Sequence, residues 1–167
     1  MVAHRKGKIT PDAILKKLKS ERAFGLHSTS PRVLSLTQPT EFGTVYTLSE
    51  LQELSRLCKE KKLLLHIDGS RLFNALVHLK ISLKEFTQKV SIDLLSLGGT
   101  KNGLMFAELL ALINPALHEG ANHIHKQTLQ LVSKMRYLSA QFIPFFEKEI
   151  CMHLATYANQ KAEEISL

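Results

Sequence analysis

The chain has 167 residues, a length that predicts one domain, or one domain with an appendage. Hydrophobic residues make up 44% of it and charged residues 22%, proportions that exclude a disordered or collagen-like chain. The formal net charge is +7. Because the basic residues are spread along the chain and no nucleic-acid-binding motif accompanies them, this charge favours a solvated basic surface over a nucleic-acid interface.

Helix-start signals and apolar periodicity predict an alternation of helices and strands. The predicted helices cover about 11–19, 47–62, 71–79 and 83–89, and the predicted strands cover 32–37, 63–67, 92–97 and part of 104–113. The T-x-x-E capping box of Thr47 and Glu50 marks one of the helix starts. The near-continuous apolar run at 63–67 is typical of a strand buried on both faces. A long helical region is expected over 118–162, with an interruption before Pro144.

The N-terminal segment has no apolar stretch typical of a secretory signal, and no apolar run approaches the ~20 residues of a membrane-spanning helix. Cys58 and Cys151 lie far apart and form no CxxC pair. The sequence therefore predicts neither a disulfide framework nor a cysteine-based zinc site. We expect a cytoplasmic protein that contacts neither membrane nor nucleic acid.

Strands that alternate with helices predict an α/β fold with a mostly parallel sheet. In such sheets, ligands bind at the carboxyl ends of the strands. This rule selects the segments 38–43, 68–71 and 98–103, which should converge in one place.

Asp68 directly follows an apolar strand, where a carboxylate is partly removed from water unless a positive group meets it. Arg71 lies three residues further on, beyond a tight turn that Gly69 permits. Two interpretations are open. Asp68 caps the next helix and pairs locally with Arg71, or it belongs to a ligand site.

The next strand end, GGTKNG at 98–103, places Lys101 among three glycines. Glycine lets the backbone approach a ligand closely, and a lysine in such a loop can bind phosphate or attack a carbonyl carbon. The segment is not a Walker A motif, and an ordinary turn with a solvated lysine is the alternative. Taken with Asp68, however, Lys101 suits pyridoxal phosphate (PLP) chemistry. The lysine would form the Schiff base, and the aspartate would keep the pyridinium nitrogen protonated so that the ring accepts electrons.

Three segments resemble successive blocks of the low-specificity L-threonine aldolases: SLTQPTEFGTVYTLSEL (35–51), LLLHIDGSRLFNAL (63–76) and DLLSLGGTKNGLMFAE (93–108). That family belongs to the aspartate-aminotransferase-like (fold type I) PLP enzymes, near the aromatic β-eliminating lyases. The resemblance implies a three-layer α/β fragment of the PLP-binding large domain over 1–120. It also implies a helical segment over 121–167 that leads toward a small C-terminal domain.

The resemblance further implies PLP as the cofactor and a homo-oligomer, either a dimer or a tetramer. The reaction would be the cleavage of L-threonine, L-allo-threonine or another β-hydroxy amino acid to glycine and an aldehyde. Carried over residue by residue, Lys101 resembles the Schiff-base lysine and Asp68 the partner of the pyridine nitrogen. Arg71 resembles an arginine that lines the cofactor site, and Gly99 and Thr100 are assigned to cofactor binding.

The remaining assignments are less direct. His27, in GLHSTSPRV, resembles an active-site histidine near the substrate hydroxyl, although a polar loop histidine is the alternative. Arg136, in SKMR, is assigned to the substrate. Ser70 stands where alanine is common in the family, a change expected to be tolerated. His123 and His125 are two residues apart on a predicted helix and share no face, so no metal site is predicted.

Members of the family are considerably longer than this chain. Their phosphate-binding loop and the ring-stacking aromatic or histidine side chain lie upstream, and their substrate-carboxylate arginine lies in the small domain. The sequence therefore predicts a PLP-dependent aldolase and leaves three alternatives. These are a truncated, inactive fragment of such an enzyme, a β-eliminating lyase that uses the same cofactor, and a basic nucleic-acid-binding module.

Overall fold

A four-stranded sheet lies at the centre of the structure, a computed structural model that describes residues 2–23, 27 and 29–166. Its strands follow the order β3 (Val33–Thr37), β4 (Leu64–Gly69), β5 (Leu94–Gly98) and β6 (Glu108–Leu112). The first three strands are parallel, and β6 runs antiparallel to β5. The predicted α/β class with a mostly parallel sheet is therefore confirmed.

The strands are joined by helices whose bounds follow the sequence signals closely. A short hairpin of β1 (His4–Arg5) and β2 (Lys8–Ile9) precedes α1 (Pro11–Ala23), and the helices between strands are α2 (Leu48–Lys61), α3 (Leu72–Leu79) and α4 (Leu83–Lys89). At the start of α2 the predicted capping box is present. The Glu50 amide donates to Thr47 Oγ1 at 3.2 Å, and the Thr47 amide donates to the Glu50 carboxylate at 2.6 Å.

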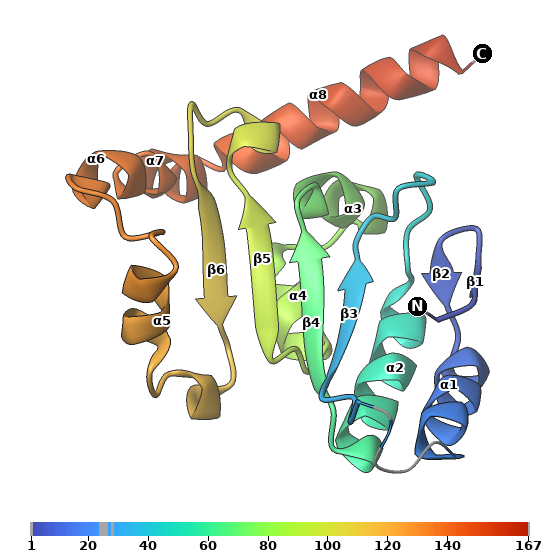
Figure 1. The fold of residues 1–167 in the computed structure, drawn as a ribbon. Helices are drawn as coiled ribbons and strands as arrows, with labels where there is room; N and C mark the ends of the chain where they lie inside the picture. Colours follow the sequence, from blue (N-terminus) through green and yellow to red (C-terminus); the bar gives the residue numbers. More distant parts are fainter. Residues whose placement is uncertain (1, 24–26, 28, 167) are drawn as a thin grey trace.

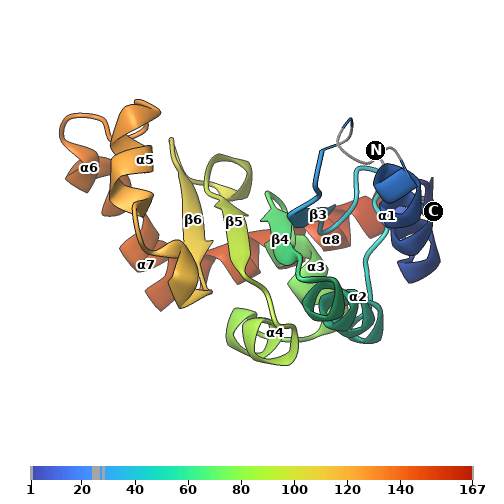
Figure 2. The same ribbon diagram turned by 60° about the horizontal axis from the view of Figure 1, so that its bottom comes forward.

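In the part of the chain that the structure describes, helices cover only one face of the sheet along β3, β4 and β5. In Figure 1, α2, α3 and α4 lie behind the strands, and Figure 2 shows them on the same side of the sheet. Burial along β4 agrees with this arrangement, because Leu65 and Ile67 are fully buried whereas Leu64, His66 and Asp68 are only half-buried. The prediction that this strand is buried on both faces is wrong for the described residues, which form the sheet and one helical layer. The second helical layer of the predicted three-layer arrangement stays a prediction.

Beyond β6 the chain is helical, but it is divided differently from the prediction. After the 3-10 turns η2 (Thr100–Asn102) and η3 (Pro115–Leu117) come α5 (Ala121–Gln127), α6 (Met135–Ser139), α7 (Phe142–Glu147) and α8 (Ile150–Ile165). The predicted interruption before Pro144 is present at residues 140–141, between α6 and α7, but the proline does not cause it, because Ile143 directly ahead of it is helical and Pro144 is the third residue of α7. Amides in the first turn of a helix have no intrahelical acceptor, so proline costs no hydrogen bond there.

The C-terminal helices pack against the same core as the sheet. Phe145 of α7 is buried and meets Phe73 of α3 edge-on, with ring centroids 5.5 Å apart. Asn74 of α3 and Asn159 of α8 exchange two hydrogen bonds, at 2.9 and 3.0 Å. No helix among the described residues is both long enough and apolar enough to cross a membrane. The domain boundary at residue 120 stays a prediction.

Candidate active site

The three strand ends selected from the sequence are hydrogen-bonded to one another. The Gln38 amide, after β3, donates to the Asp68 carbonyl at 2.9 Å. The Asn102 side chain, after β5, donates to the Ser70 carbonyl at 2.9 Å. The predicted convergence of 38–43, 68–71 and 98–103 is therefore confirmed, and the parallel register of β3, β4 and β5 produces it.

The Asp68 carboxylate is held by the turn that follows it. Its Oδ1 accepts hydrogen bonds from the Ser70 amide at 3.0 Å and from the Ser70 hydroxyl at 2.8 Å, an Asx-turn reinforced by a side chain. No described residue donates to Oδ2, and Asp68 is only half-buried. The α3 N-cap residue is Arg71, which makes no side-chain capping bond, so the interpretation of Asp68 as a helix cap is wrong.

Asp68 remains ionised at neutral pH. Partial burial raises the pKa of Asp68, but the two hydrogen bonds from Ser70 and the charges of His66 and Lys101 together hold that pKa below its ordinary value. A group whose pKa is lowered on folding stabilises the fold at pH values above its unfolded pKa, and that contribution is lost as the pH falls through the folded pKa. The effect of Lys101 shows that its charge lies within electrostatic reach of Asp68.

We expect Ser70→Ala to raise the pKa of Asp68 toward its ordinary value, because the substitution removes the hydroxyl donor and leaves the amide donor in place. A carbon-detected NMR titration of the Asp68 carboxyl in the natural full-length protein measures this change. Ser49→Ala, an exposed serine in the first turn of α2, is the matched control and should leave the titration of Asp68 unchanged. An unaltered Asp68 titration in Ser70→Ala would contradict this account of the turn.

The loop that presents Lys101 is held close to the sheet. A Cβ on Gly98 would lie 2.3 Å from the Ser70 carbonyl oxygen, and a Cβ on Gly99 would lie 2.2 Å from the Ala107 carbonyl oxygen, so only glycine fits at either position. The Glu108 carboxylate accepts hydrogen bonds from the Gly99 amide at 3.0 Å and the Thr100 amide at 3.4 Å. This tight packing fixes the backbone on both sides of the turn.

Two cationic side chains are free at this edge of the sheet. Lys101 is exposed at the centre of η2, and Arg71 is exposed at the start of α3. Neither side chain has a hydrogen-bond or ion-pair partner among residues 2–23, 27 and 29–166. Both can therefore bind an anion or react with a ligand without first breaking a contact of the fold.

His66, for which no role was predicted, lies on the same face of β4 as Asp68. Its Nδ1 is 2.8 Å from Ser35 Oγ, and its Nε2 is 2.9 Å from Ser96 Oγ, so its ring bridges β3, β4 and β5. Burial lowers the pKa of His66, and the charge of Asp68 opposes this effect only in part. The position of His66 two residues before Asp68 on a strand was the signal that could have identified it, since such residues share a face.

The structure does not bring His27 or Arg136 into contact with these groups. His27 is exposed in the connection between α1 and β3, which enters β3 at its amino end, and residues 24–26 and 28 beside it lie outside the described residues. Arg136 is exposed on α6, which lies beyond the β6 edge of the sheet in Figure 1. The roles of both residues stay predictions.

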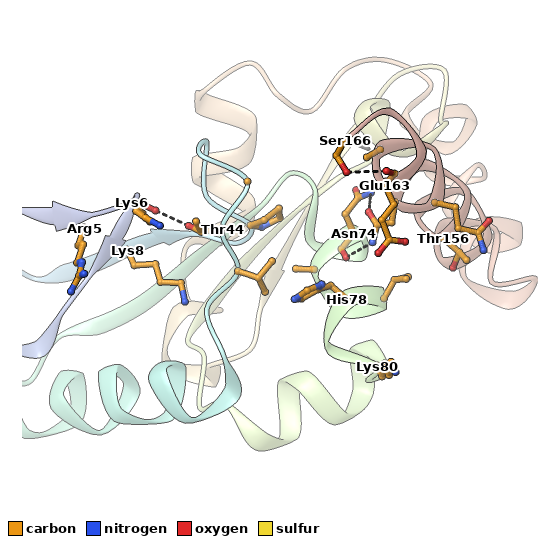
Figure 3. A pocket seen from close by; sticks show the side chains of 18 residues that line it. Arg5, Lys6, Lys8, Thr44, Asn74, His78, Lys80, Thr156, Glu163 and Ser166 are labelled. Carbon is orange, nitrogen blue, oxygen red and sulfur yellow. Dashed lines mark hydrogen bonds between the residues drawn. The ribbon is translucent and has the colours of Figure 1, made fainter.

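A cavity of about 1180 Å³ lies away from this site, between the N-terminal hairpin, the loop after β3, α3 and α8 (Figure 3). Some of its polar side chains are engaged within the fold, since Asn74 pairs with Asn159 and the Ser166 hydroxyl donates to the Glu163 carbonyl. Neither Lys101 nor Asp68 lines the cavity. The strand ends, which hold both Lys101 and Asp68, are therefore the stronger candidate for the predicted chemistry.

The arrangement of the elements matches a solved structure closely. The structure of a threonine aldolase from Leishmania major superposes with a TM-score of 0.89 and 32% sequence identity, and the match covers 98% of this chain and 47% of that protein. Together with the lysine and aspartate at neighbouring strand ends, this likeness defines the class. The chain has the fold of the fold type I PLP-dependent enzymes.

The chain belongs to the beta-eliminating lyase family, whose pattern matches residues 1–165. It is also similar to two proteins named low specificity L-threonine aldolase. One, from a Pseudomonas species, is 41% identical over 160 residues, and the other, from Pseudomonas aeruginosa, is 40% identical over 156 residues. These matches cover 96% and 93% of this chain but 46% and 44% of the two relatives, so the chain spans about half of their length. The family is PLP-dependent.

Proposed function

We propose that the protein containing this chain is a PLP-dependent aldolase that cleaves L-threonine, L-allo-threonine or a related β-hydroxy amino acid to glycine and an aldehyde. The names of its Pseudomonas and Leishmania relatives support this proposal. The observation that carries it is structural. A free lysine and an ionised aspartate with one unengaged oxygen lie on adjacent, hydrogen-bonded strand ends.

The residues present fit PLP by the chemistry of their donors. Asp68 Oδ2 has no partner among the described residues and belongs to an ionised carboxylate, which suits the protonated nitrogen of a pyridine ring. Lys101 offers an exposed amine with no ion pair to another described residue. Bound PLP would supply an electron sink for the charge that bond cleavage leaves on the substrate α-carbon.

Each residue has a distinct role in this proposal. Lys101 would hold the cofactor through its amine, and Asp68 would keep the ring nitrogen protonated. Arg71 would provide a charge for an anionic group of the cofactor or the substrate, and Gly99 and Thr100 would contribute to cofactor binding. His27 takes the proton from the substrate β-hydroxyl oxygen, directly or through a water molecule. Arg136 is proposed to contact the substrate.

Product analysis of the natural full-length protein tests the reaction itself. With L-threonine and PLP we expect glycine and acetaldehyde to form in equal amounts. The family match also includes β-eliminating lyases, which would release ammonia and a keto acid from a β-substituted amino acid. Ammonia and keto acid without glycine would identify that alternative, and the absence of turnover with either substrate class would favour an inactive protein.

The assembly and the location of the protein are part of the same proposal. Large apolar side chains are exposed on the loop before β6 and on the helices after it, including Met105 at 88%, Phe106 at 62% and Tyr137 at 69% exposure. Such side chains suit a homo-oligomer, a dimer or a tetramer, and residues 121–167 would lead toward a small domain. A monomer in sedimentation of the full-length protein would refute this part.

Cys58 and Cys151 are both buried and free, which suits the reducing environment of the cytoplasm.

A further inference from the structure

A short chain of hydrogen bonds joins the Lys101 loop to Asp68. The Asn102 side-chain amide, next to Lys101 in the sequence, donates one hydrogen bond to the Gly98 carbonyl at 2.6 Å and another to the Ser70 carbonyl at 2.9 Å. Ser70 in turn donates its amide and its hydroxyl to Asp68 Oδ1. Ser70 is therefore the point at which the two strand ends are connected.

Asn102 has almost no freedom to move. It is 5% exposed, the lowest exposure in the GGTKNG loop apart from the glycines, and both of its amide hydrogens are used. The Gly98 backbone already packs closely against the Ser70 carbonyl. The hydrogen bonds of Asn102 to Gly98 and Ser70 therefore reinforce the contact between these two strand ends. On the other side of the loop, Glu108 holds the Gly99 and Thr100 amides.

We propose that Asn102 is a positioning residue that sets the placement of Lys101 relative to Asp68. The inference rests on the proposed function, because it concerns how the two residues meet one cofactor ring. A ring of fixed size requires its two anchoring groups at a fixed separation, and a displacement of about 1 Å can cost a factor of about 100 in rate. The exposed and unpaired Lys101 side chain cannot set this separation itself, so the backbone beneath it must do so.

A purely structural role for Asn102 would give a different result. If Asn102 only satisfied two buried carbonyl oxygens, its loss would lower the free energy of unfolding without a specific effect on the cofactor. The control for this possibility is Asn159→Ala, which also removes two side-chain hydrogen bonds between distant segments, but between α3 and α8. The two variants lose matched contacts at different places.

The experiment compares Asn102→Ala, Asn159→Ala and the wild-type full-length protein. Four quantities are measured: the free energy of unfolding in urea, the fraction of Lys101 that borohydride links to PLP over a range of PLP concentrations, and kcat and KM for L-threonine. For Asn102→Ala we expect the PLP concentration needed for half-maximal labelling to rise at least tenfold, and kcat to fall about 100-fold with a smaller change in KM. Asn159→Ala should lose stability while its labelling and kcat stay within about twofold of wild type.

Equal labelling and kcat in Asn102→Ala and Asn159→Ala would overturn the proposal. If Asn102→Ala does not fold, Asn102→Ser, which keeps one hydroxyl donor, is judged by the same criterion and should show an intermediate loss. The wild-type protein separates this inference from the proposed function. Absence of PLP on its Lys101 would refute the proposed function, whereas normal labelling in wild type and in the Asn102 variants would refute only the positioning role.

Discussion

Lys101→Ala is expected to abolish borohydride-stable attachment of PLP and to lower kcat for L-threonine by roughly 10⁴-fold or more, as loss of a covalent catalytic group does in other enzymes. The physical reason is that the described structure offers one free amine in the GGTKNG loop, within electrostatic reach of Asp68. Peptide mapping of the reduced protein and single-turnover kinetics measure the two effects.

Lys84→Ala provides the matched control for Lys101. Lys84 is an exposed lysine in the first turn of α4, on the helical side of the sheet, and it contributes nothing to the strand ends. We expect this variant to retain both labelling and kcat. Attachment of PLP at another lysine, with activity preserved in Lys101→Ala, would show that the assignment of Lys101 is wrong.

Asp68→Asn is expected to produce the second large effect. Asparagine keeps the size and can keep the hydrogen bonds from Ser70, but it has no charge with which to hold a proton on a pyridine nitrogen. We expect PLP still to label Lys101, while kcat falls by a factor of about 10² to 10³, the range seen when a single electrostatic contact to a developing charge is removed. The labelled fraction of Lys101 measures cofactor attachment, and steady-state kinetics measures kcat, so the two together show that Asp68 affects the rate and not the attachment.

Asp93→Asn is the control for Asp68. Asp93 lies at the amino end of β5, where its carboxylate accepts from the Leu65 amide at 2.8 Å and from the Asn114 side chain at 2.6 Å. This substitution should reduce the free energy of unfolding and leave the kcat of the folded protein close to wild type. A kcat in Asp68→Asn equal to that in Asp93→Asn would contradict the proposed role of Asp68.

The features that were predicted correctly from the sequence are those with a local physical cause. The capping box of Thr47 and Glu50 involves neighbouring residues, and the apolar periodicity of 83–89 gave the bounds of α4. The convergence of the segments 38–43, 68–71 and 98–103 needed only the rule that parallel strands present their carboxyl ends at one edge. That rule applies to any sheet of this class, so no knowledge of side-chain contacts was required.

The features that were missed depend on contacts between distant residues. Asn102 and Ser70 are 32 positions apart, and nothing in the spacing of GGTKNG indicates that the asparagine amide reaches across to another strand end. The burial of β4 on one face depends on which helices lie over the sheet, and an apolar run such as LLLHI does not reveal that. The break before Pro144 was predicted, but it lies at residues 140–141 and not directly ahead of the proline, because the sequence does not show that Pro144 falls in the first turn of the next helix.

A crystal structure of the natural full-length protein with PLP tests the central claim most directly. We expect continuous density between Lys101 Nζ and the cofactor, with Asp68 Oδ2 about 2.7 to 2.9 Å from the ring nitrogen, the length of a charge-assisted hydrogen bond. Density for PLP that joins a different lysine, or a ring nitrogen that faces a group other than Asp68, would contradict the account.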